Sequence, residues 1–180
     1  LIDGDVVNED SNYDEKFWDV LDAEVTNDTA FLMTRTVPNP FGVSQFTVAA
    51  RQRFVSDLPA IDVVQEDKQV GNVFAGQVGA ATQRIEKRVI VTTSRDYADD
   101  TAVKHATDTI FASIASATYD DLYDAHVAGW AARWEKADVQ ITGDEAAQQG
   151  IRFNLFQLFA TYYGNDARLN IGPKGFTGEK

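Results

Sequence analysis

The order of apolar and polar positions changes near the middle of the chain, from a period of two to a period between three and four. Residues 45–54, "QFTVAARQRF", alternate, with one side formed by Phe46, Val48, Ala50 and Phe54 and the other by Gln45, Thr47, Arg51 and Arg53. Such alternation is typical of a strand with one buried face. Residues 29–36 and 87–94 are also strand-like, and the turn-forming segment 37–42 and the polar segment 65–71 separate such runs. We predict part of an antiparallel sheet or sandwich.

The second half carries a helical pattern. The spacing predicts a first helix after Asp99, with an acidic start that favours its dipole and an apolar face made of Val103, Ala106, Ile110, Ile114 and Ala117. A second helix is predicted from about residue 119 to 136. Thr142 and Glu145 stand in the spacing of a capping box and predict the start of a third helix, which Gly164 is placed to end. The acidic opening, residues 3–20, shows only a short first strand and a loop. The predicted class is therefore α+β.

The third helix is apolar on more than one face. Its main stripe consists of Ile151, Leu155, Leu158, Phe159 and Tyr162, and further apolar residues lie outside it at Phe153, Phe156, Ala160 and Tyr163. A helix of this kind needs neighbours on two sides, so we expect that some of its partners lie outside the chain. Arg152 and Asn154 interrupt the apolar pattern, and we expect them to need polar partners, because burying an unpaired guanidinium is costly.

Composition narrows the possible partners. The chain has 180 residues, 44% of them apolar, which is enough for one domain or parts of two. Its formal net charge is −12 at pH 7. Nucleic acids and anionic membranes require a concentrated basic face, so this charge argues against both. With no cysteine and two histidines, we expect no metal and no cofactor. The chain shows no leader pattern and no apolar run of bilayer length, so we expect a soluble, cytoplasmic fragment.

Two groups of side chains offer chemistry, and each has a structural alternative. His126, Trp130 and Arg133 share one helix face, which suits stacking on a sugar, although a tryptophan-rich stripe more often packs at a junction between domains. Packing is the interpretation we favour. Carboxylate pairs that suit glycoside cleavage are Glu135 with Asp138 and Asp144 with Glu145. Nothing singles out either pair, and the second has a plain capping position at a helix start.

The last residues, "NIGPKGFTGEK", form the most plausible functional loop. They lack the spacing of a nucleotide-binding phosphate loop, because that loop needs two glycines five positions apart, and Thr177 and Lys180 stand five positions after Gly172 and Gly175. Lys174 brings a positive charge, the glycines allow close backbone approach, and Glu179 could accept hydrogen bonds from sugar hydroxyls. A plain connection between helices remains an equal alternative from the residues alone.

Residues 126–180 resemble the start of the catalytic domain of the glycoside phosphorylases grouped as glycoside hydrolase family sixty-five. The matching positions are His126, Trp130, Arg133, Trp134, Asp138, Gly143, Asp144, Gln148, Arg152, Phe153, Asn154, Asn170, Ile171, Lys174, Gly175, Thr177, Gly178 and Glu179. The segments "NYDEKFWDVL", "VPNPFG" and "EKRVIVTTSRDY" extend the resemblance over essentially the whole chain. Within the family, the chain is most similar to the members that cleave maltose.

The resemblance implies an architecture of an N-terminal β-sandwich, a helical linker, an α/α barrel and a small β domain. On this chain it implies the last strands of the sandwich in residues 1–98, the linker in 99–137 and the start of the catalytic barrel in 138–180. The third helix would then be the first helix of the barrel, whose other helices would supply its missing partners.

The resemblance also implies an activity, which is inverting phosphorolysis of maltose to β-D-glucose 1-phosphate and glucose, with inorganic phosphate as co-substrate. It implies a homodimer, a general-acid glutamate and a phosphate site beyond Lys180, and no catalytic residue in this chain. Lys174, Gly178 and Glu179 would line or support the sugar site. Two alternatives stay open, namely a sister phosphorylase for trehalose or kojibiose, and a module that binds carbohydrate or mediates dimerisation without catalysis.

Overall fold

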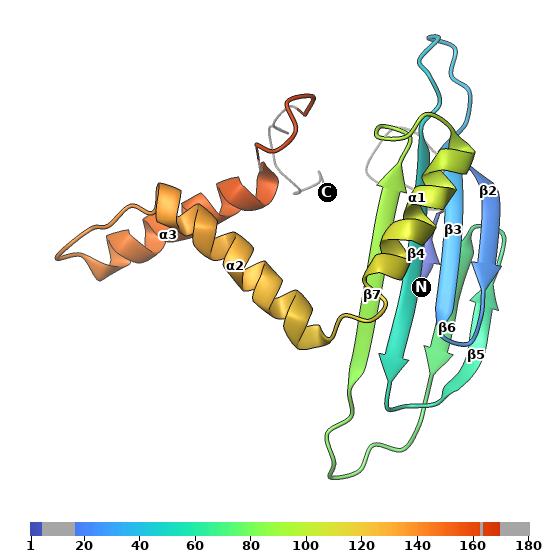
Figure 1. Ribbon diagram of the computed structural model, residues 1–180, viewed down its shortest axis with the longest axis horizontal. Helices are drawn as coiled ribbons and strands as arrows, with labels where there is room; N and C mark the ends of the chain where they lie inside the picture. Colours follow the sequence, from blue (N-terminus) through green and yellow to red (C-terminus); the bar gives the residue numbers. More distant parts are fainter. Residues whose placement is uncertain (5–16, 163, 170–180) are drawn as a thin grey trace. The chain divides into compact units, whose positions relative to one another are not determined.

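The chain forms two structural units in the computed structural model, which describes residues 1–4, 17–162 and 164–169 (Figure 1). The first unit comprises Leu1–Ser116 and the second Ala117–Lys180. The elements of the first unit are β1 (Ile2–Asp3), β2 (Trp18–Val25), β3 (Thr29–Thr36), β4 (Thr47–Ser56), β5 (Ala60–Gln65), β6 (Gln69–Phe74), β7 (Ile85–Thr93) and α1 (Asp100–Ser113). Those of the second unit are α2 (Tyr119–Ala137) and α3 (Glu145–Thr161).

The strands make two antiparallel sheets, as the alternating pattern predicts. One sheet has the order β1-β6-β5 and the other the order β2-β3-β4-β7. Strand β4 lies between β3 and β7, pairing Ala50 with Leu32 on one side and with Val91 on the other. The predicted fold class, antiparallel sandwich strands followed by helices, is therefore confirmed. The expectation missed β2, β5 and β6, because their short or acidic stretches show little alternation.

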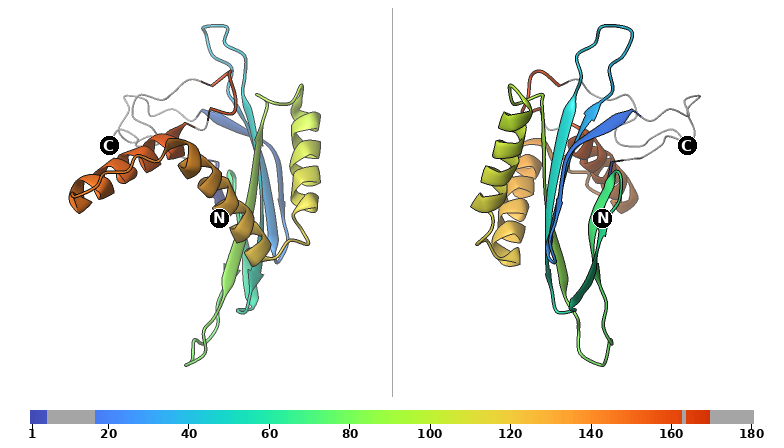
Figure 2. Two further views of the ribbon diagram at one scale, coloured as in Figure 1. Left: turned by 60° about the vertical axis from the view of Figure 1, so that its left-hand side comes forward. Right: turned by 90° about the vertical axis from the view of Figure 1, so that its right-hand side faces the viewer.

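Strand β3 is buried on both faces. On one face Phe31 and Met33 pack with Val103 of α1, and on the other Ala30 and Leu32 pack with strands of the smaller sheet. Helix α1 and the smaller sheet therefore cover opposite faces of the four-stranded sheet, as the right-hand view of Figure 2 shows.

The prediction that β4 has only one buried face was wrong. Thr47, on the side expected to be polar, is 2% exposed, and Ala49 on the same side is fully buried. Helix α1 lies over this side. The alternation of the residues correctly predicted a strand, but the covering helix comes from a distant part of the sequence.

Helix α1 is tied to the sheet at its first turn. Asp99 caps the helix by accepting a hydrogen bond of 2.8 Å from the backbone N–H of Ala102. Asp100 accepts a bond of 2.6 Å from the Thr47 hydroxyl and pairs with Arg35 at 3.0 Å. These contacts fix which end of the helix lies near the start of β4, and so set the position of the residues that follow along α1.

A cluster of five charged residues holds the same helix to the sheet further along, and we call it the α1 ion cluster: Asp22, Glu24, Arg51, Lys104 and Asp108. Arg51 pairs with Glu24 at 3.2 Å and with Asp108 at 2.8 Å. Lys104 pairs with Glu24 at 2.7 Å and also with Asp22. Both cations lie over the buried ring of Phe31, with centroid distances of 4.5 and 5.1 Å.

The second unit contains two helices with well-defined ends. Helix α2 begins with a capping box, in which the Thr118 hydroxyl accepts from the N–H of Asp121 and the Asp121 carboxylate accepts from the N–H of Thr118. The capping box expected at the start of α3 was wrong, because Asp144, not Thr142, is the cap. Helix α3 ends at Thr161, and Gly164 has a φ of +69°, which suits its expected role as a terminator.

Helix α1 belongs structurally with the sheets, since it packs on β4 and β7, whereas α2 and α3 make up the other unit. The sequence-based boundaries at residues 98 and 137 stay predictions. Among the described residues, no helix is long and apolar enough to cross a membrane.

Burial predicts different costs for two substitutions on α1. Val103 is fully buried against Phe31, whereas Ile110 is 37% exposed. We expect Val103→Ala to lower the free energy of unfolding by about 2 kcal/mol, through lost apolar burial and a residual cavity. Ile110→Ala, which changes a residue of the same helix, should cost less than about 1 kcal/mol. Urea unfolding followed by tryptophan fluorescence measures both, and equal costs would contradict this packing.

The α1 ion cluster predicts a pH-dependent stability. Hydrogen bonding to Lys104 lowers the pKa of Glu24 below 4.5, and bonding to Asp22 and Glu24 raises the pKa of Lys104 above 10.5. The stabilisation that comes from the lowered pKa of Glu24 is lost as the pH falls through the pKa of Glu24 in the folded protein. The stabilisation that comes from the raised pKa of Lys104 is lost as the pH rises through the pKa of Lys104 in the folded protein. The stability difference between wild type and Lys104→Met should therefore be largest between about pH 5 and 10.

Unfolding midpoints across that pH range test the ion cluster, with Lys136→Met on the exposed end of α2 as a control. The control should show a smaller difference that varies little with pH. A Lys104→Met difference that stays constant into acid would mean that the Lys104 stem, not its charge, supplies the stabilisation.

Candidate functional site

The residues that the sequence singled out for a sugar site lie outside the described part of the chain. Lys174, Gly178 and Glu179 belong to the terminal segment, and the structure says nothing of their positions. The described residues closest in sequence with candidate chemistry lie at the corner between α2 and α3. We call residues 138–144 the corner loop.

Arg152 holds the first residue of the corner loop. Its Nε and Nη2 atoms donate to the two carboxylate oxygens of Asp138, at 2.9 and 2.6 Å. These bonds from Arg152 lower the pKa of Asp138, and the pKa of Arg152 is raised in turn. Arg152 thus has the polar partner that its place in the sequence predicted, although its side chain is 51% exposed rather than buried. Asn154, the other polar residue of that pattern, is exposed.

Gln148 holds the middle of the corner loop. Its Nε2 donates to the carbonyl of Val139 at 2.9 Å, and its Oε1 accepts from the N–H of Ile141 at 2.6 Å. Asp144 then caps α3 by accepting from the N–H of Ala147 at 2.9 Å. The predicted structural role of Asp144 is confirmed. Three side chains of one short region therefore keep the loop in a single arrangement.

A hollow of about 510 Å³ lies beside the corner loop. Its lining consists of Ile141, Gly143, Asp144, Glu145, Gln148, Gln149, Arg152 and Phe153. Three of its polar lining residues are already engaged, because Gln148 and Arg152 bond the loop and Asp144 caps the helix. Its volume would admit a small ligand, but these side chains serve first to shape the loop.

The aromatic face of α2 packs against α3. Trp130 stacks on Phe156 with ring centroids 5.2 Å apart, and Trp134 meets Phe159 edge-on at 5.5 Å. His126 is exposed and lies edge-on to Trp130 at 6.3 Å. The two tryptophans of this stripe therefore pack on α3 within the second unit, whereas packing at a junction between domains stays a prediction. Both tryptophans are partly buried.

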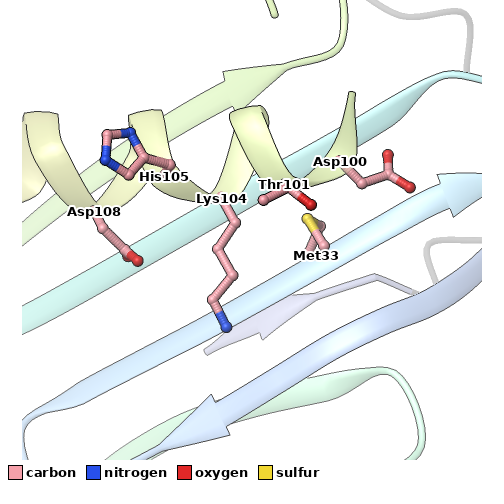
Figure 3. A pocket seen from close by; sticks show the side chains of 6 residues that line it. All are labelled: Met33, Asp100, Thr101, Lys104, His105 and Asp108. Atoms are coloured by element: carbon pink, nitrogen blue, oxygen red, sulfur yellow. The ribbon is translucent and has the colours of Figure 1, made fainter. Parts of the chain in front are cut away.

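A second hollow, of about 340 Å³, lies against α1 in the first unit (Figure 3). Met33, Asp100, Thr101, Lys104, His105 and Asp108 line it. Lys104 extends from the helix over the strands in Figure 3 and reaches its partners in the α1 ion cluster. Asp100 and Asp108 are paired with arginines of the sheet. The charges around this hollow therefore hold α1 in place and do not converge on an empty centre.

One carboxylate of each candidate pair has a structural partner. Asp138 is bound by Arg152 and Asp144 by the helix end, so the described structure gives each a local role. No group of three or more potential metal ligands gathers anywhere in the described ranges of the chain. Sequence reasoning missed the role of Gln148, although its position four residues after Asp144 places both on one side of α3.

Comparison with known families accounts for this combination of sandwich strands and helices. Residues 1–133 match the family described as "Glycosyl hydrolase family 65, N-terminal domain". The chain therefore belongs to glycoside hydrolase family 65, in agreement with the resemblance found in its sequence.

Several relatives of the chain are disaccharide phosphorylases by name. The chain is 44% identical to the maltose phosphorylase of Bacillus subtilis over 180 residues, which is 99% of this chain and 23% of that protein. It is 34% identical over 95 residues to a kojibiose phosphorylase of Caldanaerobacter subterraneus, covering 53% of this chain and 12% of that protein. An α,α-trehalose phosphorylase of Geobacillus stearothermophilus is 54% identical over 46 residues, or 26% of this chain and 6% of the relative. The chain thus spans less than a quarter of the length of each relative.

The corner loop predicts unequal effects for two neighbouring glutamines. Gln148→Ala removes two hydrogen bonds to the loop, whereas Gln149→Ala changes an exposed neighbour on the same helix. Both gain the same helix propensity, so their difference reports the lost bonds. We expect Gln148→Ala to lower stability by about 1–2 kcal/mol relative to Gln149→Ala. Amide exchange at Ile141 should accelerate only in Gln148→Ala, and unchanged exchange would mean that the loop does not depend on this side chain.

Proposed function

We propose that the intact polypeptide carrying this chain is an inverting glycoside phosphorylase that converts maltose and phosphate to β-D-glucose 1-phosphate and glucose. The observation that carries this proposal is the 44% identity to a maltose phosphorylase over 99% of the chain. The kojibiose and trehalose relatives match shorter parts, over 53% and 26% of the chain, so they support the phosphorylase class more than another sugar.

The chemistry of phosphorolysis needs few protein groups. An inverting hydrolase uses one carboxylic acid to protonate the leaving oxygen and one carboxylate to activate water. Inorganic phosphate is already an anionic nucleophile, so the second carboxylate becomes unnecessary and one general acid suffices. This chain would contribute no catalytic residue, and the acid and the phosphate site would lie beyond Lys180.

The chain would serve as the junction between a sandwich and a catalytic barrel. Residues 1–98 would complete the sandwich, 99–137 would link, and 138–180 would begin the α/α barrel. The exposed apolar residues of α3 support a barrel, since Phe153 is 61% and Leu158 is 63% exposed, and further barrel helices would cover them. A cytoplasmic homodimer is the assembly we propose for the whole enzyme.

The terminal segment would reach the sugar site in the intact enzyme. Lys174, Gly178 and Glu179 would line or support that site without taking part in bond cleavage. The corner loop would hold α3, and so the segment that follows it, in a fixed arrangement.

The test is an assay of the intact polypeptide with maltose, trehalose or kojibiose, each with and without phosphate. We expect maltose to give glucose and β-glucose 1-phosphate, identified by the anomeric coupling in proton NMR, and only when phosphate is present. Release from trehalose or kojibiose but not maltose would assign a sister specificity. If the intact polypeptide is no longer than 180 residues and releases no glucose 1-phosphate, the alternative is favoured, namely a module that binds carbohydrate or mediates dimerisation without catalysis.

A further inference from the structure

The loop between β3 and β4 exposes apolar side chains at the tip of the sandwich unit. It extends past the end of the sheet in both figures that show the whole chain (Figures 1 and 2). Phe41 at its tip is 86% exposed and Val43 is 66% exposed. Phe46 of the same loop is 38% exposed, so the loop carries a group of exposed apolar side chains, which marks an interaction site where a single exposed residue would not. Residues 37–46 also carry no charge, in a chain whose net charge is −12.

Hydrogen bonds hold this loop in one shape. The side chain of Asn39 accepts from the backbone N–H groups of Phe41 and Val43, at 3.0 and 3.2 Å, and donates to the carbonyl of Val43 at 2.8 Å. At the base, the Thr36 hydroxyl accepts from the N–H of Phe46 at 2.8 Å. Prolines at 38 and 40 restrict the backbone further. A loop arranged in advance loses little conformational entropy when its tip is bound.

The polar groups of the loop decide what kind of surface it fits. Asn39 is used three times within the loop, and Gln45 donates its amide N–H to the carbonyl of Thr36 at 2.6 Å. A sugar subsite needs polar groups that point at the hydroxyls of its ligand. Here those groups point inward and the tip presents apolar surface, so an apolar protein pocket is a better fit than a saccharide.

We propose that the Phe41 loop is a docking element that inserts into an apolar pocket elsewhere in the same polypeptide, outside residues 1–180. The proposal rests on the proposed function only in assuming that the chain is part of a longer phosphorylase. The matching maltose phosphorylase has more than three quarters of its length outside the region covered by this chain. Such a length provides ample surface for a pocket, and docking there would fix the sandwich against the remainder of the enzyme.

Photo-crosslinking in the intact protein tests this contact. Phe41 is replaced by p-benzoylphenylalanine, which keeps the aromatic ring and bonds to neighbouring C–H groups under light. The matched control places the same residue at Val78, which is 72% exposed on the β6–β7 loop at the opposite end of the sheets (Figure 1). We expect position 41 to give an intramolecular crosslink to a peptide outside residues 1–180, and position 78 to give none. Adding Asn39→Ala should lower the yield at position 41.

Each other outcome would overturn the proposal. A crosslinked dimer on a denaturing gel would assign the loop to a second copy of the chain. A crosslink within residues 1–180, or no crosslink at position 41, would mean that the tip does not dock elsewhere in the polypeptide. The assay with maltose is independent of this result. A protein that gives the expected crosslink but does not cleave maltose would support the docking element and contradict the proposed activity.

Discussion

The first unit depends on the burial of β3 on both of its faces. A strand in the middle of a sheet exposes two rows of side chains, and here both rows are apolar, with Phe31 and Met33 on one side and Ala30 and Leu32 on the other. Each row needs a separate cover to leave water. The smaller sheet supplies one cover and α1 supplies the other, which is why α1 packs with the strands instead of acting as a free connection.

Covering the helix side of the sheet places charged residues over a buried aromatic ring. Arg51 leaves the sheet on this side with 15% of its side chain exposed, so its guanidinium needs partners, and Glu24 and Asp108 provide them. Lys104 approaches from the helix and uses Glu24 as well. The acidic excess of the chain thus has a local use, because carboxylates from β2 and α1 neutralise two cations that lie above Phe31.

Elements with a periodic pattern in neighbouring residues could be predicted from the sequence. Burial and contacts that depend on distant residues could not. The alternation of β4 and the three helices could be predicted, because strand and helix periods are written in neighbouring residues. The burial of Thr47 could not, since its cover is formed by residues more than fifty positions later. At the start of α3, Thr142 and Asp144 both suit a cap, and the choice falls to the backbone around Gly143, whose φ is +91°. The role of Gln148 needs the fold of a loop that carries no periodic signal.

The division of the chain by packing differs from its division by family likeness. The family match ends at residue 133, inside α2, whereas the first compact unit ends at Ser116. Helix α2 makes its aromatic contacts with α3 through Trp130 and Trp134, on either side of that family boundary.

The relatives limit what sequence identity says about the sugar. A trehalose phosphorylase is 54% identical over 46 residues, and the maltose phosphorylase is 44% identical over 180 residues. Those 46 residues cannot by themselves distinguish the two sugars. Identity over this part of the chain therefore does not separate a maltose relative from a trehalose relative.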